Sequence, residues 1–269
     1  MNPIINIVTR VSRKETFDRC YNSIHEQTYK NINHICTYQN DDIYNFLKDY
    51  ENLNLLKVPN LKSFNNLYYS FNSHTLTDDF INPNWDIFDR KIELSKDYEI
   101  FSIPAEVKKF EKKISDNSYY FCYTPDFTVR WQLKHFPYNQ FLKIAEKRFK
   151  DGWVIYIDDD DVFMNENSLK TIVDNIKKHD EDTIHIWKAK YLNSNSTKPS
   201  EDFWIKMSMC YPFVLNEVGG SIFTYHTKWS DWTMWDEWSG ADYRTLKSLE
   251  KVIPNKNFID EIIIHIMSN

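Results

Sequence analysis

The sequence predicts an α/β protein with a parallel, Rossmann-like sheet, and two patterns in its 269 residues carry this prediction. Between residues 4 and 58, short apolar stretches typical of strands alternate with amphipathic stretches typical of helices. Such alternation favours parallel strands joined by helical crossovers. The second pattern is the continuous apolar run Trp153–Ile157, which suits a central strand that is covered on both faces.

The N-terminal part is expected to contain three strands and two helices. In chain order these are a strand at 4–9, a helix at 14–27, a strand at 33–38, a helix at 43–51 and a strand at 53–58. The first helix is supported by residues at helical spacing, namely Phe17, Cys20, Tyr21 and Ile24. The second strand ends in the polar cluster 39–42, where a ligand of such a sheet would bind.

The regular alternation stops at about residue 61 and returns at about residue 137. We interpret 61–136 as an insertion in the same domain, with a separate domain as the alternative, and therefore predict that residues 1–269 form a single domain of sheet and flanking helices. Within the insertion, the aromatic stretch 119–123 and the stretch 127–133 predict a hairpin around Thr124-Pro125-Asp126.

After the insertion, the strand and helix patterns alternate again. The expected elements are a helix at 138–150, a strand at 153–157, a helix at 168–178, and strands at 183–188 and 222–225, followed by a helix at 242–251 and a strand at 259–267. Gly219-Gly220-Ser221 precedes the strand at 222–225, and its two glycines predict a turn.

Composition excludes several classes of function. The net charge of −6 and a pI near 5.8 argue against nucleic-acid binding through a general basic field. The four cysteines form no C-x-x-C pair, so neither a zinc site nor a disulfide framework is expected, and a reducing, cytoplasmic location is the simplest interpretation. The N-terminus lacks the charge and length of a signal peptide, and no apolar run approaches the ~20 residues of a membrane span.

Four consecutive aspartates, Asp158 to Asp161, stand at the C-terminal end of the predicted central strand. Ligands of open α/β sheets bind beyond this end of the strands. Four like charges so close together need a counter-ion, and Mg²⁺ or Mn²⁺ is the natural one because both prefer carboxylate and phosphate oxygens. In an extended segment, Asp158 and Asp160 face the same side. The alternative is a solvated acidic turn that caps the next helix.

The aspartates alone leave the reaction open. Metal-dependent nucleotidyltransferases and phosphohydrolases also place aspartates at strand ends. Such enzymes would predict a glycine-rich phosphate loop after the first strand, whereas the basic stretch 9–14 contains no glycine. A non-catalytic carbohydrate-binding protein is a third possibility, with tryptophans as a sugar platform and the aspartates as a structural ion site.

Two stretches together resemble family 2 glycosyltransferases of the GT-A fold, the nucleotide-sugar-dependent type with an Asp-x-Asp motif. The helix motif Ser-x-x-x-Gln-Thr/Ser-Tyr of that family is matched by Ser23, Gln27, Thr28 and Tyr29. The stretch 157–163, Ile-Asp-Asp-Asp-Asp-Val-Phe, resembles the family's Leu-Asp-x-Asp-Asp pattern. The resemblance covers about 1–60 and 137–170, is moderate over 210–269 and is absent over 61–136.

The resemblance implies a metal-dependent and inverting transfer of a hexosyl or related sugar, in glycan biosynthesis, from a nucleoside diphosphate sugar to an acceptor hydroxyl. The implied donor-site residues are Thr9, Arg10, Asp41, Asp42, Asn139, Asp158 and Asp159. The family often has Asp-Asp-x-Ser where this chain has residues 40–43, Asn-Asp-Asp-Ile, so the contacts to the base are open. Alternation along an extended segment would turn Asp159 away from its neighbours.

The resemblance also implies a metal site and a catalytic base. The metal candidates are Asp160, Asp158, Asp161 and His265, with His226 as a further alternative. Asp242 is the first candidate for the base that takes the proton of the acceptor hydroxyl, and Asp236 and Glu237 are its rivals. We expect tryptophans within 229–238 to stack on the acceptor. Asp242 could instead only cap its helix, and His265 could be an ordinary core residue.

Overall fold

The computed structural model of the chain describes residues 2–58, 139–209, 213, 217–235 and 241–267, and six short strands between 67 and 133. The chain divides into two compact units. One unit consists of Met1–Asn60, Tyr138–Trp235 and Ala241–Asn269, and the other of Leu61–Pro137 and Asp236–Gly240. The second unit nearly coincides with the predicted insertion at 61–136.

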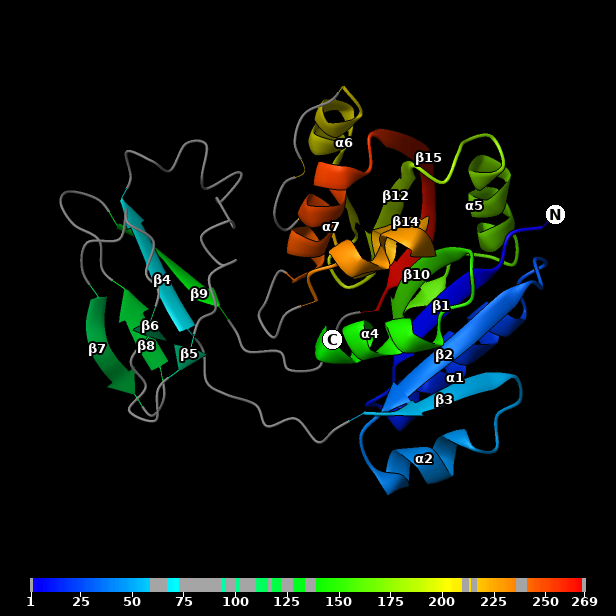
Figure 1. Cartoon of the computed structure of the whole chain (residues 1–269), viewed down its shortest axis with the longest axis horizontal. Helices are drawn as coiled ribbons and strands as arrows, with labels where there is room; N and C mark the ends of the chain where they lie inside the picture. Colours follow the sequence, from blue (N-terminus) through cyan, green and yellow to red (C-terminus); the bar gives the residue numbers. More distant parts are fainter. Residues whose placement is uncertain are drawn as a thin grey trace. The chain divides into compact units, whose positions relative to one another are not determined.

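The first unit contains a mixed, mostly parallel sheet whose strand order is β11-β15-β12-β14-β10-β1-β2-β3, with β13 paired to β12 (Figure 1). The strands β3, β2, β1 and β10 are parallel neighbours. The strand β14 runs antiparallel to both β10 and β12, and β12 is parallel to β15. Parallel strands with helical connections confirm the predicted α/β class.

The N-terminal elements follow the expected order closely. They are β1 (Ile5–Arg10), α1 (Lys14–His25), β2 (Ile32–Tyr38), α2 (Asp41–Leu47) and β3 (Leu53–Lys57). The helix α1 buries Phe17, Cys20 and Ile24, which lie on one face at helical spacing. Phe17 then packs with Leu47 of α2 in the same core cluster. The predicted amphipathic pattern therefore places α1 against the sheet.

The C-terminal part of this unit completes the sheet. Its helices and helical turns are α4 (Asn139–Ala145), η3 (Glu146–Arg148), α5 (Ser168–Ile176), α6 (Glu201–Ser208), η4 (Gly220–Ile222), η5 (Thr227–Trp232) and α7 (Ala241–Val252). Its strands are β10 (Trp153–Asp158), β11 (Val162–Phe163), β12 (Thr183–Tyr191), β13 (Ser196–Lys198), β14 (Phe223–His226) and β15 (Asn255–Ile266). The sequence patterns did not predict α6, β11 or β13.

The strand β10 is the central strand that the apolar run predicts. Its residues Val154 to Ile157 are buried, with β1 on one side and β14 on the other. Because β1, β2, β3, β10, β12 and β15 all run the same way, their carboxyl ends share one edge of the sheet. Arg10 pairs with Asp158 at this edge. Tyr191, the last residue of β12, lies at the same edge.

The described part of the second unit consists of two small sheets. One has the order β7-β8-β4-β9, with strands Phe110–Ser115, Ser118–Phe121, Leu67–Asn72 and Thr128–Leu133, and the other pairs β5 (Glu93–Leu94) with β6 (Ile100–Phe101). The predicted hairpin between 119–123 and 127–133 is wrong, because β4 lies between β8 and β9 and pairs with both. Local sequence does not reveal a strand that enters from more than 40 residues upstream.

Gly152 fixes the entry into β10. Its φ is +154°, and a Cβ at this position would lie 2.3 Å from the carbonyl oxygen of Ile4. The same carbonyl accepts a hydrogen bond from the N–H of Trp153 at 2.8 Å. A side chain at residue 152 would therefore push apart the first pair of the β1–β10 ladder.

We predict that Gly152→Ala lowers the free energy of unfolding by about 2–4 kcal/mol, through strained backbone and overpacking. Chemical denaturation of the two proteins would measure the difference. Gly219→Ala is the matched control, because a Cβ there would have its nearest neighbours at 3.8 Å, an ordinary contact. Equal stability of Gly152→Ala and wild type would contradict the close approach of residues 4 and 152.

Candidate functional site

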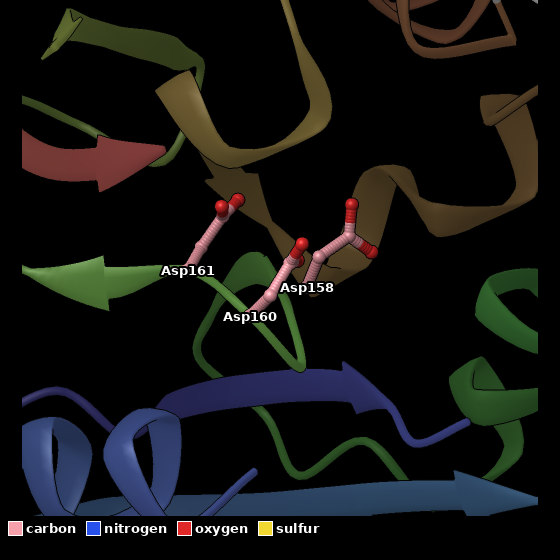
Figure 2. Close-up of side chains that lie close together, drawn as sticks. All are labelled: Asp158, Asp160 and Asp161. Atoms are coloured by element: carbon pink, nitrogen blue, oxygen red, sulfur yellow. The ribbon is translucent and has the colours of Figure 1, made fainter. Parts of the chain in front are cut away.

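Three carboxylates converge at the carboxyl edge of the sheet. Asp158 ends β10, and Asp160 and Asp161 lie in the turn that leads to β11. One oxygen of each carboxylate lies within 4.8 Å of those of the other two, and Figure 2 shows all three pointing to the same side. Among the described residues, this is the one group of three or more such side chains that could hold a metal ion.

A tight turn produces this convergence. The N–H of Asp161 donates to the carbonyl of Asp158 at 3.0 Å, which folds the aspartate run back on itself. Asp158 and Asp160 share one side, as expected, and the turn adds Asp161 to them. The side chains of Asp160 and Asp161 are buried, whereas that of Asp158 is 44% exposed. A ligand would therefore reach the group most directly past Asp158.

Asp159 has a different environment from its neighbours. It is completely buried, and its carboxylate accepts hydrogen bonds from the backbone N–H groups of Ser12 and Arg13 at 2.6 and 2.8 Å. The hydroxyl of Ser12 donates to it as well, at 3.1 Å. Asp159 thus fastens the loop between β1 and α1 to the end of β10, and it is not one of the three converging carboxylates, although one nitrogen of Arg13 bonds to both Asp159 and Asp160.

Two arginines supply positive charge to the aspartate run. Arg10 contacts Asp158 at 2.9 Å and Asn139 at 3.3 Å, so three predicted donor-site residues lie together. Arg13 binds both oxygens of Asp160, at 2.5 and 2.7 Å, and also bonds to Asp159. Arg13 is a residue of this site that the sequence patterns did not indicate. The available signal was its place in the basic stretch 9–14 directly after a strand.

Asp161 is the most enclosed of the three converging carboxylates. Its oxygens accept hydrogen bonds from the hydroxyl of Ser221 and the N–H of Met267, both at 3.2 Å. Burial raises the pKa of Asp161 well above the ordinary carboxyl value, and the charges of Asp158 and Asp160 raise it further. In its ionised form this side chain therefore needs a nearby cation.

Asp242 lies near the carboxylate group, in the first turn of α7. Burial raises its pKa above the ordinary carboxyl value, and the charge of Asp158 adds to this effect, while the N–H of Tyr243 at 2.8 Å opposes it. Gly219 lies next to both Asp242 and Tyr191. A Cβ on Gly219 would lie 3.8 Å from an oxygen of Asp242 and 3.8 Å from the hydroxyl of Tyr191.

Tyr191 is a second residue of this site that the sequence patterns did not indicate. Burial, and then the charges of Asp242, Asp161, Glu217 and Asp158, raise its pKa to about 12. The phenol therefore stays protonated at neutral pH and is available as a hydrogen-bond donor among carboxylates. Its place at the end of β12, beyond the apolar residues that the strand pattern uses, gave no signal in the sequence.

Several predicted donor-site residues lie elsewhere on the same edge. Thr9 is buried, and its hydroxyl forms a hydrogen bond of 3.0 Å with the ring of His34. Asp41 and Asp42 are exposed in the first turn of α2, where they form ion pairs with Lys57 and Lys14, at 2.6 and 2.5 Å. The rival bases Asp236 and Glu237 lie outside the described residues.

The two histidines considered as metal ligands are not in the carboxylate group. His265 lies in β15, in register with Val162 of β11, and burial followed by the charge of Lys190 lowers its pKa. His226 pairs with Trp153 at the start of β10, whereas the aspartates follow its end. His226 as a metal ligand is therefore wrong, since the length of the strand separates it from them.

The tryptophans of 229–238 have different environments. The indole N–H of Trp229 donates to the carbonyl of Glu181 at 3.2 Å, just before β12 begins, so Trp229 lies at the opposite edge of the sheet from the aspartates and the prediction is wrong for it. Trp235 packs edge-on against Tyr156, with ring centroids 4.6 Å apart, and a Cβ on Gly220 would lie 3.4 Å from its ring and 3.9 Å from the Cβ of Asp242. Stacking of Trp235 on an acceptor stays a prediction, and Trp238 lies outside the described residues.

The sequence comparisons give no family for the chain: no protein-family model matches it, and no curated protein matches it. Solved structures do match. A crystal structure of S. aureus TarS 1-349 is similar at 12% sequence identity and a TM-score of 0.52, covering 97% of this chain and 59% of that one. The same fragment in complex with UDP-GlcNAc gives 11% and 0.52, covering 98% and 58%. Its complex with UDP gives 12% and 0.50, covering 98% and 60%.

This likeness concerns the fold. Together with the strand order, it confirms the predicted class, a Rossmann-like α/β sheet flanked by helices, and it supports a GT-A-like fold. The chain spans about three fifths of the TarS fragment that it matches. None of the helices in the described part of the chain is long and apolar enough to cross a bilayer.

We predict that Asp161→Asn raises the thermal midpoint of the metal-free protein at neutral pH by several degrees, because it removes one of three crowded charges. The asparagine oxygen can still accept from the N–H of Met267, and its amide group can donate to the hydroxyl of Ser221, which can accept as well as donate. The raised pKa of Asp161 means that the folded state disfavours the ionised carboxylate, so wild type loses stability as the pH rises towards and through this pKa. The difference in thermal midpoint between Asp161→Asn and wild type should therefore grow with pH.

Calorimetry at a series of pH values would measure this difference. Asp174→Asn is the control, because Asp174 is an ion-paired surface residue of α5, 2.5 Å from Lys170, and its loss should bring no gain. A midpoint of Asp161→Asn below that of wild type at neutral pH would contradict the repulsion described above.

Proposed function

We propose that the chain transfers a hexosyl or related sugar from a nucleoside diphosphate sugar to the hydroxyl of a glycan acceptor, with the help of a divalent ion. The observation that carries the proposal is the convergence of Asp158, Asp160 and Asp161 at the carboxyl edge of the sheet. It is supported by the likeness of the fold to TarS, which was crystallised with UDP-GlcNAc and with UDP.

The side chains fit a hard divalent ion. Mg²⁺ and Mn²⁺ bind through one or two carboxylates and substrate phosphates, and three carboxylate oxygens within 4.8 Å offer such a set. The raised pKa of Asp161 means that the ionised carboxylate lacks sufficient positive charge around it, which a divalent ion would supply. Asp160, Asp158 and Asp161 would hold the ion, which would stabilise the negative charge of the departing diphosphate.

The donor would lie over the carboxyl ends of β1 and β10, where ligands of such sheets bind. Arg10, held between Asp158 and Asn139, is suited to orient a phosphate group. Asp41 and Asp42 are the candidates for contacts with the base or ribose, and each would exchange a lysine partner for the ligand. Thr9, whose hydroxyl is hydrogen-bonded to the ring of His34, would lie beneath the bound nucleotide.

Asp242 is our first choice for the base of an inverting transfer. A carboxylate whose pKa is raised by burial accepts a proton more readily than an ordinary one. Asp242 and the hydroxyl of Tyr191 both lie near Gly219. Tyr191, which is protonated, would donate a hydrogen bond to the sugar. Asp236 and Glu237 remain the alternative bases.

A fourth metal ligand and the cellular location stay as predictions. His265 as a fourth metal ligand would require its ring to reach the carboxylates from β15. A cytoplasmic location is consistent with Cys20 and Cys36, the two cysteines in the described part of the chain, which are both free and buried.

Incubation with UDP- and GDP-sugars, with and without Mn²⁺, tests the function. Slow metal-dependent release of the nucleoside diphosphate supports a transferase. Release of the monophosphate would favour the metal-dependent phosphohydrolase or nucleotidyltransferase. No turnover together with retained glycan binding would favour the carbohydrate-binding protein.

We predict that Asp160→Asn lowers kcat for release of the nucleoside diphosphate at least about a hundredfold, because it removes the central ligand of a charge-stabilising ion. Steady-state kinetics with saturating Mn²⁺ would measure the loss. Asp49→Asn is the control, since it removes the same charge from an exposed position of the same unit. Wild-type turnover in Asp160→Asn would contradict the metal assignment.

We predict that Asp242→Asn lowers kcat for transfer by about 10²–10⁴-fold and leaves the Kd for the nucleotide unchanged, because the variant loses only the proton acceptor. In wild type, activity should fall on the acidic side at a pH above the ordinary carboxyl range. Asp202→Asn, at the equivalent first turn of α6, is the control. Full activity of Asp242→Asn would transfer the role to Asp236 or Glu237.

A further inference from the structure

Arg13 binds Asp160, the carboxylate that is the first candidate for a ligand of the proposed metal ion. Its two terminal nitrogens bind the two oxygens of Asp160 at 2.5 and 2.7 Å. This is the bidentate geometry in which a guanidinium binds a carboxylate most strongly. The positive charge that balances Asp160 is thus part of the chain.

A divalent ion on Asp160 and the guanidinium of Arg13 would compete. Each carboxylate oxygen has lone pairs for more than one partner, so the competition is electrostatic rather than only steric. An ion bound to Asp160 would lie about 4–6 Å from the guanidinium, where like charges disfavour each other. Binding of the ion alone therefore has to overcome the Arg13–Asp160 pair.

Asp159 anchors one side of the Arg13 guanidinium, and the other side binds Asp160. Asp159 accepts hydrogen bonds from the backbone N–H of Arg13 at 2.8 Å, from its Nε at 2.8 Å and from its Nη2, whereas Nη1 binds Asp160. Leaving Asp160 therefore also breaks the hydrogen bond from Nη2 to Asp159. Asp159 itself is fully buried, so this anchor is fixed. The side chain of Arg13 is 35% exposed, and its outer end therefore has room to turn towards solvent or a ligand.

We propose that Arg13 is the resident counter-ion of Asp160 and that it exchanges this carboxylate for the diphosphate of the donor when the metal ion binds. The proposal rests on the proposed function and deepens it. A planar guanidinium suits both carboxylate and phosphate, so Arg13 keeps an anionic partner in either state. Metal and donor then bind cooperatively, each favouring the other, because Arg13 leaves Asp160 only when it gains the phosphate.

The exchange predicts opposite effects on two ligands. Arg13→Ala should bind Mn²⁺ alone at least about fivefold more tightly than wild type, because the competing charge is gone. It should bind UDP or GDP in the presence of Mn²⁺ several-fold more weakly, because the phosphate contact is gone. A residue that only shapes the site would weaken both on removal. Arg13→Lys, which keeps the charge but not the fork, should lie between.

Electron paramagnetic resonance of free Mn²⁺ would give the metal affinity without nucleotide, and calorimetry would give the nucleotide affinity. Arg19→Ala is the matched control, because it removes the same charge from an exposed position of α1 and should change neither value. Circular dichroism would establish that each variant is folded, and Arg13→Lys carries the test if Arg13→Ala is not.

Unchanged or weaker Mn²⁺ binding by the folded Arg13 variants would overturn the exchange while leaving the metal site intact. Unchanged nucleotide affinity would also overturn it, because Arg13 would then gain no phosphate. If wild type and all variants bind no Mn²⁺ even with nucleotide, the metal site itself fails. That result would overturn the proposed role of Asp158, Asp160 and Asp161 together with the exchange.

Discussion

The repulsion among the carboxylates that follow β10 is the constraint on which the rest of the site depends. One hydrogen bond, from the N–H of Asp161 to the carbonyl of Asp158, gathers like charges that would otherwise spread along an extended chain. The surrounding groups are then donors or cations: Arg10, Arg13, Ser221 and the N–H of Met267. These come from three segments far apart in the sequence, so the folded chain compensates for the charge only when the sheet is complete.

The order of the strands explains how distant segments meet at this place. The antiparallel strand β14 lies between β10 and β12, and the segment that leads into it passes over the carboxyl edge. That segment contains Gly219, which lies next to Asp242, and Ser221, whose hydroxyl donates to Asp161. The parallel pairing of β12 with β15 brings Tyr191 beside Ile266, next to the donor N–H of Met267. A sheet with all strands parallel in sequence order would not give this arrangement.

The fold and the centre of the site could be predicted from local patterns, whereas the partners of that centre could not. The apolar run before Asp158 revealed both a buried strand and the edge where it ends, because hydrophobic continuity is a local signal. Arg13 contacts Asp160 across a sequence separation of 147, and only the register of β1 on β10 decides that meeting. Trp229 failed as a sugar platform for the same reason, since its position depends on the direction of β14 and not on its aromatic neighbours.

Gly219 lies next to the two groups that would handle the acceptor, the carboxylate of Asp242 and the phenol of Tyr191. Both are 3.8 Å from the point where a β-carbon would stand, which is the usual spacing of atoms in contact. A methyl group at residue 219 would thus touch both groups without displacing the backbone. In the proposed transferase, such a methyl group would change the size of the acceptor that fits beside Asp242 and Tyr191, while the carboxylates after β10 and the strands of the sheet would stay as they are.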